Sequence, residues 1–397
     1  MRFNTYVMEN ALESIIDYRG KTPRKSETGI VTLSAKSVRD GYIDYSQGYF
    51  ISEEEYKRFM VRGFPKRGDV LLTTEAPLGV LARLDREDIA IAQRLLTLRG
   101  KEGVLDTGYL YYYLRSPIGQ AKLRERESGT TVTGIKQAEF RKIIINIPDI
   151  EVQKKIASVL EVLDKRIDNN KKINENLSEQ ARAVFQAWFL DYEPFGGAAP
   201  SDWCPSTLGQ IAEIKTDSWS PAKNPDVVVE HYSIPAFDEQ HYPVFEIASG
   251  IKSNKYILNS NSVMISKLNP DTKRIWRPMC LSAHPVCSTE FIVYEAKKQE
   301  QRDYIYSILD SVPFLNHLCA HTTGSTNSRQ RATPKSTLDF TLCLPPDSVI
   351  EDFCQIVTPM YNLIASNIVE NQSLAKTRDS LLPRLMSGEL DVSNLDL

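Results

Sequence analysis

The clearest pattern of apolar and polar residues along this chain is a helical stripe that occurs twice. Apolar side chains recur at intervals of three and four residues from Ile156 to Phe189, and again from Phe353 to Leu385. This spacing places them on one face of an α-helix, as in the seam of a coiled coil. It predicts a helix over 149–190, about 60 Å long at ~1.5 Å per residue, and a matching helix after Pro345.

The sequence around these stripes is itself repeated. Without a gap, residues 147–177 align with residues 344–374, and the offset of 197 places Asn170 on Asn367 and Asn174 on Asn371. The starts of the two halves also match, because LESIIDY at Leu12 resembles LGQIAEI at Leu208. A period this long predicts two copies of one unit rather than a solenoid.

Two equivalent helices in one chain can pair with each other, and they would run antiparallel if the repeats are related by a two-fold axis. The asparagines at 170, 174, 367 and 371 interrupt the stripes. Polar residues at a seam can fix its register at a cost in stability. The alternative is that these side chains face water.

The segment before each stripe has an α+β pattern. Short runs rich in Ile, Val, Leu and Thr, bounded by Gly, Asp or Pro, predict strands. In the first half they are 29–35, 69–75, 89–98 and 142–148, and in the second 262–268, 288–296 and 339–345. Helices are predicted over 52–60, 106–129 and 302–318, with Ser52 and Glu55 spaced as a capping box.

Composition narrows the class of protein. No apolar run reaches the ~18 residues of a membrane span, and the N-terminal residues lack the apolar core of a secretory signal. All six cysteines lie in the second half without a paired pattern, so we expect reduced thiols and a cytoplasmic location. Residues 1–148 carry 24 Lys and Arg against 19 Asp and Glu, whereas residues 346–397 carry 3 against 8.

Polar loops precede the last predicted strand of each half, at 128–140 and 322–336. They are dense in Thr, Ser, Gly and basic residues, whose hydroxyl and cationic groups can contact phosphates and base edges of nucleic acid. A solvated surface loop is the alternative for each. With nearby basic residues, the candidate DNA-binding residues are Arg19, Lys21, Arg24, Lys25, Lys36, Arg39, Thr130, Thr131, Thr133, Lys136, Lys223, Lys267, Lys273, Arg274, Arg277, Thr323, Ser325, Asn327, Ser328, Arg329 and Arg331.

The end of the first stripe is unusually aromatic. Trp188, Phe189, Tyr192 and Phe195 exceed what one helix pair needs to bury, so they are candidates for a partner-binding patch. The alternative is packing against the chain's own globular parts. A Gly/Ala/Pro-rich linker follows at 197–205.

Catalytic signatures are missing from the chain. We find no phosphate-binding loop, no nucleophile elbow, no HExxH zinc motif and no Asn-Pro-Pro-aromatic motif of amino-methyltransferases. Cys280, His284 and Cys287, with His317, Cys319 and His321, form a weak zinc candidate without tight ligand pairs. We therefore expect no catalytic residue, no metal site and no cofactor in this chain.

Several segments together resemble the specificity subunit of type I restriction–modification enzymes. GDVLLTTEAPLG at 68–79 is followed by AIAQRLLTLRG at 90–100, and SGTTVTGI at 128–135 leads into NIPDIEVQKKIASVLEVLDKRI at 146–167. AVFQAWFLDYEPF at 183–195 and RDSLLPRLMSGELDV at 378–392 resemble the ends of the family's two conserved helices. The order, spacing and duplication of these segments carry the resemblance, which covers nearly the whole chain.

The resemblance implies a domain organisation. Residues 1–148 would form the first target recognition domain, 149–196 the central spacer helix, 197–345 the second recognition domain and 346–397 the C-terminal spacer helix. The two helices would pair as an antiparallel coiled coil. Each recognition domain would read one half of a split DNA target.

The resemblance also implies partners. Two methyltransferase subunits would bind S-adenosylmethionine and methylate adenine, and restriction subunits would cut DNA. Because the two loops differ in sequence, we expect two different half-sites and an asymmetric target. An alternative function is a coiled-coil scaffold that joins two protein-binding domains without recognising DNA. A stand-alone nuclease has little support in the sequence.

Overall fold

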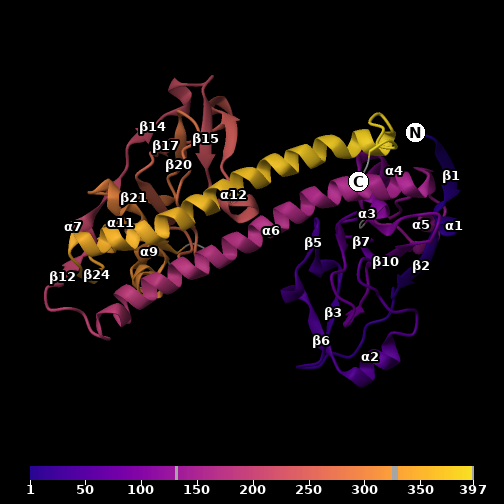
Figure 1. The fold of residues 1–397 in the computed structure, drawn as a ribbon, viewed down its shortest axis with the longest axis horizontal. Helices are drawn as coiled ribbons and strands as arrows, with labels where there is room; N and C mark the ends of the chain where they lie inside the picture. The colour runs from indigo at the N-terminus through magenta and orange to yellow at the C-terminus, as the bar shows by residue number, and fades with distance from the viewer. Residues whose placement is uncertain (130–132, 324–329, 396–397) are drawn as a thin grey trace. The chain divides into compact units, whose positions relative to one another are not determined.

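The computed structural model describes residues 1–129, 133–323 and 330–395, and its contacts divide the chain into two compact units. Unit 1 comprises Met1–Asp168 and Gln372–Leu397, and unit 2 comprises Asn169–Asn371. The long helices α6 (Ile150–Phe189) and α12 (Asp347–Ser387) each contribute residues to both units (Figure 1). Both helix predictions are confirmed.

Paired side chains show that α6 and α12 run antiparallel. In unit 1, the Arg378 guanidinium of α12 donates to Asp164 of α6 over 2.7 Å. In unit 2, Asn170 of α6 donates to Asn371 of α12 over 2.9 Å. Residue numbers therefore fall along α12 as they rise along α6, which confirms the predicted antiparallel pairing.

The asparagines lie in the seam rather than in water. Asn170 and Asn367 are only 1% and 6% exposed. The Asn170 amide donates to Asn371, and the Asn367 amide donates to Asn174 over 2.8 Å. Each bond joins one repeat's first asparagine to the other repeat's second, so a shift in register would break both.

In its described residues, unit 1 contains a four-stranded sheet, a three-stranded sheet and two two-stranded pairs, one of which joins β4 (Val38–Arg39) to β5 (Tyr42–Ile43). In the first sheet the strands follow the order β2-β10-β7-β8, all antiparallel, and a separate pair joins β1 to β11. The second sheet has the order β6-β3-β9, with β3 and β9 parallel. The bounds are β1 Phe3–Val7, β2 Leu12–Asp17, β3 Ile30–Leu33, β6 Tyr49–Ile51, β7 Val70–Thr73, β8 Leu81–Arg83, β9 Ile89–Ile91, β10 Leu95–Gly100 and β11 Ile144–Pro148.

Unit 2 repeats this plan with a larger second sheet. Its first sheet has the order β13-β21-β18-β19, and β12 pairs with β24. The second sheet has five strands, in the order β14-β17-β20-β15-β16, with β15 and β20 parallel. The bounds are β12 Cys204–Thr207, β13 Ala212–Lys215, β14 Ser218–Trp219, β15 Val228–Tyr232, β16 Val244–Ile247, β17 Lys255–Ile257, β18 Ser262–Ser266, β19 Ile275–Trp276, β20 Pro285–Ser288, β21 Phe291–Ala296 and β24 Thr341–Leu344.

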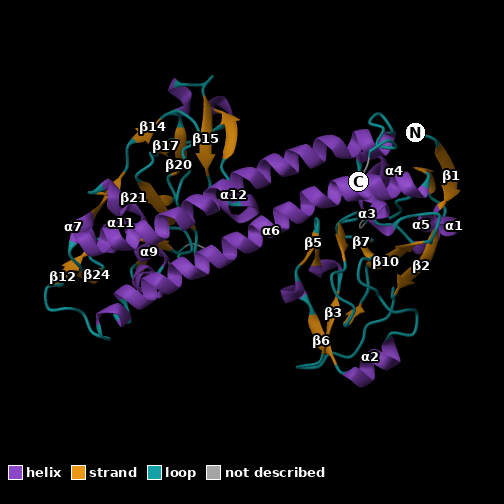
Figure 2. Ribbon diagram, in the orientation of Figure 1, coloured by secondary structure: helices purple, strands orange, loops and turns teal. Residues whose placement is uncertain are grey.

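The shorter helices also correspond between the units, which supports the α+β prediction (Figure 2). In each unit two consecutive helices pack on the first sheet, and a one-turn helix precedes β2 or β13. In unit 1 the helices are α1 Met8–Ala11, α2 Glu53–Phe59, α3 Thr107–Arg115, α4 Pro117–Arg124 and α5 Gln137–Arg141. In unit 2 they are α7 Leu208–Ile211, α8 Ile234–Gln240, α9 Arg302–Asp310, α10 Val312–Ala320 and α11 Pro334–Thr337.

Several element predictions were wrong in detail. The predicted strand 89–98 is two strands, because the chain turns at Arg94, whose φ is +66°. The predicted helices 106–129 and 302–318 each break in two at a serine, Ser116 and Ser311, whose hydroxyl caps the second helix. Ser52 caps α2, but the Glu55 carboxylate bonds the backbone N–H of Arg24 instead of completing the capping box.

The sequence alignment of the two starts was also wrong, by one helical turn. The sheet pairs Leu12 with Gly100 and Ala212 with Ala296. Leu12 therefore corresponds to Ala212, and the partner of Leu208 in the repeat is Met8, which begins α1. Leu and Ile recur along both amphipathic segments, so sequence similarity alone favoured the shifted match.

In each unit, an arginine at the edge of the first sheet bonds side chains of neighbouring helices. Sheet register makes Arg83, at the end of β8, equivalent to Arg277, which follows β19. Arg83 forms an ion pair with Glu161 of α6. Arg277 instead pairs in two places with Asp303 of α9, over 2.7 and 3.1 Å, and bonds Asn362 of α12 over 2.8 Å.

The carboxylate that pairs with the arginine therefore lies on the long helix α6 in unit 1 and on the short helix α9 in unit 2. Asp303 occupies the position of Gly108 in α3, and Thr358 occupies that of Glu161. A Cβ atom at Gly108 would lie 2.9 Å from the Glu161 carboxylate, so a side chain there would require the end of Glu161 to shift. In unit 2 the smaller Thr358 leaves room for Asp303 and hydrogen-bonds it.

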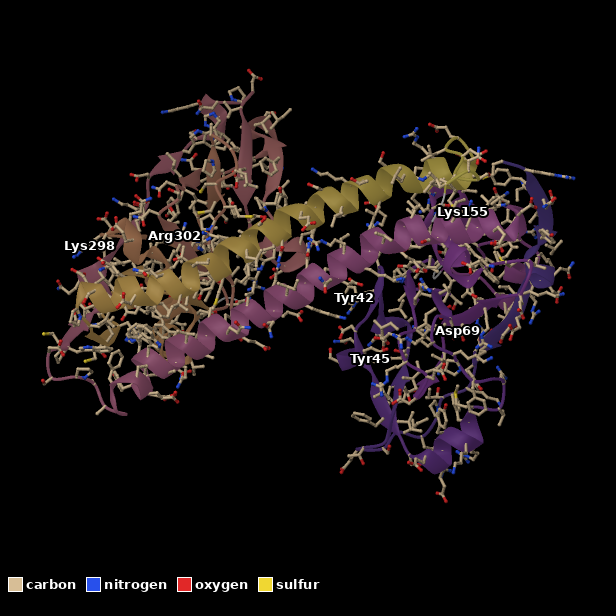
Figure 3. The ribbon with its side chains drawn as sticks, viewed as in Figure 1. Tyr42, Tyr45, Asp69, Lys155, Lys298 and Arg302 are labelled. Carbon is tan, nitrogen blue, oxygen red and sulfur yellow. The ribbon has the colours of Figure 1, made fainter. Side chains whose placement is uncertain are left out.

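A second polar contact holds the start of each long helix. The fully buried Gln153 of α6 donates to the carbonyls of Val104 and Pro148 and accepts from the N–H of Asp106. Unit 2 has Ile350 at this position. There Lys298 and Gln301 bond Asp347 at the start of α12, so the contact is kept with different residues; Lys298 is labelled in Figure 3.

We predict that the paired asparagines fix register more than they add stability. Asn170→Leu leaves Asn371 without its donor and should lower the free energy of unfolding by about 1–3 kcal/mol. Asn170→Leu with Asn371→Leu removes both partners and should recover most of that loss. Urea denaturation measures both, with exposed Lys154→Ala as the control. A double variant no more stable than the single one would contradict the pairing.

We predict unequal costs for the two equivalent arginines. Burial tends to raise the pKa of Asp303, but the Arg277 bonds outweigh it and hold that pKa below its usual range. Arg277→Leu removes both of its hydrogen bonds to this carboxylate and leaves Arg302, 3.1 Å away, as the described ion-pair partner of Asp303, at a cost of about 2–3 kcal/mol. Arg83→Leu, at a more exposed pair, should cost about 1 kcal/mol or less.

The Arg277→Leu loss should depend on pH. Arg277 is the first of the groups that lower the pKa of Asp303, so its loss raises that pKa even with Arg302 still in place. The penalty is therefore full where the carboxyl is ionised and shrinks as it protonates. Urea denaturation at pH 7 and pH 4.5 should show a smaller loss at pH 4.5. Equal losses at both pH values would argue against a buried ionised Asp303.

Candidate nucleic-acid interface

The polar loop of unit 1 is built on a frame of backbone hydrogen bonds. The Thr74 N–H donates to the Arg94 carbonyl over 3.0 Å, and the Ile135 N–H donates to the Thr74 carbonyl over 2.9 Å. Ser128 and Gly134 bond each other in both directions, over 2.9 and 3.0 Å, which closes the loop. These bonds attach the end of the loop, at Ile135, to the turn after β7, and that turn is itself bonded to the turn before β10.

The polar loop of unit 2 stands on an equivalent frame. The Lys267 N–H donates to the Glu290 carbonyl over 2.9 Å, and the Ala332 N–H donates to the Lys267 carbonyl over 2.8 Å. The loop is closed by the pair β22 (Thr322–Thr323) and β23 (Arg331–Ala332). Because the frame uses backbone groups, the side chains on it can differ between the repeats.

The turn after the central strand also has the same conformation in both units. Ala76 and Asn269 are equivalent by sheet register, and both have left-handed backbones, with φ of +52° and +50°. Left-handed φ is uncommon outside glycine, and more so for alanine than for asparagine. The turn beneath the polar loop therefore has the same backbone conformation in both repeats.

An ion pair lies in each frame, and the equivalent positions 94 and 290 carry opposite charges. In unit 1, Arg94 pairs with Glu75 over 2.8 Å. In unit 2, Glu290 occupies the place of Arg94 and pairs with Arg331 over 3.0 and 3.1 Å. Arg331, a candidate DNA contact, is thus held by a carboxylate while its side chain stays about half exposed.

The predicted basic turn of unit 1 joins this frame. The Arg19 guanidinium donates to the Ile135 carbonyl over 2.9 Å, which links the turn to the end of the polar loop. Lys21, Arg24 and Lys25 are exposed, and the Lys25 ammonium lies 4.8 Å from the centre of the Tyr49 ring.

Other candidates of unit 1 are placed less directly. Thr133 and Lys136 are exposed at the end of the polar loop. Lys36 lies in a short 3-10 helix, and Arg39 is 3.9 Å from the Asp44 carboxylate. Thr130 and Thr131 lie outside the described residues.

In unit 2, three candidate cations are engaged by carboxylates. Lys273 binds Asp310, Arg274 binds Asp238 over 2.6 and 2.9 Å, and Arg277 is the sheet-edge arginine described above. Arg277 is only 10% exposed, so its observed role is structural. DNA contact by these three residues stays a prediction.

The remaining candidates of unit 2 lie nearer the loop or apart from it. Lys267 is part of the frame, Thr323 is exposed in β22, and Lys223 ends a short 3-10 helix. Ser325, Asn327, Ser328 and Arg329 fall outside the described parts of the chain.

The aromatic end of α6 packs inside unit 2. Phe189 is 7% exposed and its ring lies 5.0 Å from that of Phe353, while Trp188, Tyr192 and Phe195 are partly buried against the same core. This is the alternative considered from the sequence. Partner binding stays a prediction, and Phe189 has little surface left to contribute to it.

Sequence reasoning missed one cation beside the loop of unit 1. Arg124, at the end of α4, lines a groove of about 410 Å³ together with Pro77, Leu78 and Thr133. The guanidinium is exposed, and the structure gives it no carboxylate partner within the described residues. Arg124 precedes the loop by only four residues, so its position in the sequence was a signal that could have found it.

Two further searches concern metals and membranes. Across residues 1–129, 133–323 and 330–395, no three His, Cys, Asp or Glu side chains are placed to hold a metal ion. The cysteines and histidines of the weak zinc candidate are therefore not brought together. No helix in the same ranges is long and apolar enough to cross a membrane.

Comparison with known proteins gives consistent matches. The family model described as the type I restriction modification DNA specificity domain matches residues 15–179. The type I restriction enzyme MjaIX specificity subunit of Methanocaldococcus jannaschii is 28% identical, over 89% of this chain and 85% of that protein. The HindI specificity subunit of Haemophilus influenzae is 20% identical, over 82% and 87% of the two chains.

A solved structure shares the fold. The S subunit of a type I restriction–modification system from M. genitalium superposes with a TM-score of 0.64 at 15% identity, over 97% of this chain and 96% of that one. The family model covers the first repeat, and the second repeat has the same frame and sheet order. Residues 15–179 therefore match the DNA specificity domain of type I restriction–modification enzymes, and most of the chain is similar to specificity subunits of these enzymes.

Proposed function

We propose that this chain selects an asymmetric, bipartite DNA target, with one half-site read by each recognition domain. The observation that carries the proposal is the duplicated loop frame with different side chains on each copy. Equal frames present their loops in the same way, whereas different side chains favour different bases. Similarity to specificity subunits supports DNA specificity as the general role.

Phosphate contacts and base contacts would have different roles. Cations of the basic turn, such as Lys21 and Lys25, would bind phosphates and supply affinity that depends on salt. Loop residues such as Thr133, Lys136 and Arg331 would contact base edges in the major groove and supply choice. Such contacts need exposed side chains, and all five are exposed.

The chemistry would belong to partner subunits. Two methyltransferase subunits would carry S-adenosylmethionine and methylate an adenine that flips out of the duplex. Restriction subunits would add cleavage of foreign DNA. This chain would hold no cofactor and catalyse no step, and the assembly would act in the cytoplasm.

A protein scaffold without DNA recognition is the second candidate considered from the sequence. It would use the same helices to join two protein-binding domains. The similarity to specificity subunits does not favour it. The next experiment separates the two functions directly.

We predict that deleting this gene removes one methylated motif from the host genome. Long-read sequencing with and without the gene would show loss of adenine methylation at a single target in two unlike halves. The same data would give both half-sites and their spacing. A palindromic motif would contradict the two different half-sites, and unchanged methylation in a strain with active methyltransferase subunits would favour the scaffold.

We predict that Lys136→Ala relaxes one position of the motif. Losing one base contact should reduce discrimination there by about 1–3 kcal/mol, so that related sequences become methylated. The same experiment applies to Arg329→Ala in the second loop. Lys142→Ala is the matched control, because that exposed lysine pairs with Glu139 on the neighbouring α5 segment. A motif that is unchanged in Lys136→Ala would remove Lys136 from the reading residues.

A further inference from the structure

A second basic surface lies in unit 1, on the segment that leaves α2 and approaches β7. Between residues 57 and 67 the chain carries five exposed cations and no acidic residue: Lys57, Arg58, Arg62, Lys66 and Arg67. Val61 and Phe64 stand among them, 65% and 56% exposed. We call residues 57–67 the α2 basic surface.

Most of this charge is not neutralised within the chain. Arg58 pairs with Glu55 over 2.6 Å, and Arg62 donates to the backbone carbonyl of Asp17 over 2.7 Å. For Lys57, Lys66 and Arg67, the structure shows no side-chain ion pair with any described residue. Three exposed cations without an ion pair to a described residue therefore lie within eleven residues, and the Asp69 and Glu87 carboxylates bond the backbone N–H groups of Lys66 and Arg67 instead of their side chains.

The α2 basic surface is tied to the basic turn at 19–25. The Tyr18 hydroxyl accepts from the Arg62 N–H over 2.8 Å and reaches the Gly63 carbonyl over 3.2 Å. The Glu55 carboxylate accepts from the Arg24 N–H over 3.0 Å, and this bond, with the nearby Arg58, keeps the Glu55 pKa low. The basic turn is also bonded to the end of the recognition loop, because Arg19 donates to the Ile135 carbonyl.

The corresponding segment of unit 2 lacks this charge. Between β16 and β18, residues 248–261 contain two lysines, and one of them, Lys255, is buried. The other, Lys252, is the single exposed cation there. The basic surface is therefore a property of the first domain and not of the repeated plan.

We infer that the α2 basic surface binds the sugar–phosphate backbone of duplex DNA next to the half-site read by the first domain. This inference rests on the proposed function, since it extends that DNA interface along the basic turn. Lys57, Lys66 and Arg67 contact phosphates, and Val61 and Phe64 pack on the sugars between them. The contacts add affinity without adding sequence preference.

Charge favours DNA over a protein as the occupant. Lysine, unlike arginine, is depleted in protein–protein interfaces relative to the rest of the surface, and two of the three unpaired cations here are lysines. Here cations surround the two apolar side chains on both sides in the sequence. Continuity with the recognition loop places the same surface along the path of a duplex already bound there.

The test compares salt dependence of DNA binding. The complex of the full chain with its methyltransferase subunit is measured on a duplex with the target and on an unrelated duplex. The variant is Lys57→Gln, Lys66→Gln and Arg67→Gln. Lys101→Gln, Lys154→Gln and Lys165→Gln make the same change in charge at exposed lysines elsewhere in unit 1.

The triple variant should lower the slope of log affinity against log salt by about 2–3 on both duplexes, since each phosphate contact contributes ~0.9. The control variant should keep the original slope. Phe64→Ser should weaken binding on both duplexes and leave the slope unchanged. The methylated motif should be the same in all variants.

An unchanged slope in the triple variant overturns the inference. Loss of methyltransferase assembly with an unchanged slope also overturns it and makes the surface a protein contact. A changed motif overturns it too, because the surface would then read bases. Failure of the proposed function looks different, since the unaltered complex would then not prefer its target duplex.

Discussion

The structure depends on attaching a charged, polar sheet edge to two long helices without leaving a buried charge unpaired. Arg83 and Arg277 meet this requirement at equivalent places. An unpaired ion at the buried Arg277 site costs several kcal/mol, whereas the pair of Arg83 is more exposed and contributes less. The sheet's position on the helices, and with it the placing of the recognition loop, follows from that pairing.

The two repeats satisfy the same constraint with exchanged residues. Gly108 faces Glu161 in unit 1, and Asp303 faces Thr358 in unit 2, so one carboxylate is present in each but on different helices. The asparagines of the helix seam, in contrast, are kept as identical residues. An asparagine amide carries both a donor and an acceptor, so the same residue can serve on either side of the seam, whereas an ion pair needs one residue of each charge.

The same division would allow the two repeats to present different side chains on equivalent frames. The frame under each polar loop consists of backbone bonds, which do not depend on residue type. Side chains above the frame can therefore change without moving the loop. Beyond the frame the units diverge further, because the second sheet has three strands in unit 1 and five in unit 2, and only unit 1 carries the α2 basic surface.

The sequence by itself determined the long helices, the repeat and the α+β class, because periodicity and capping act between near neighbours. It also indicated the polar loops and the family resemblance. Only the tertiary structure decided that Arg277 is engaged and Lys66 is not, that Phe189 packs inward, and that Leu12 corresponds to Ala212. Ion pairing, burial and sheet register depend on residues far apart in the chain, and a local pattern carries no information about them.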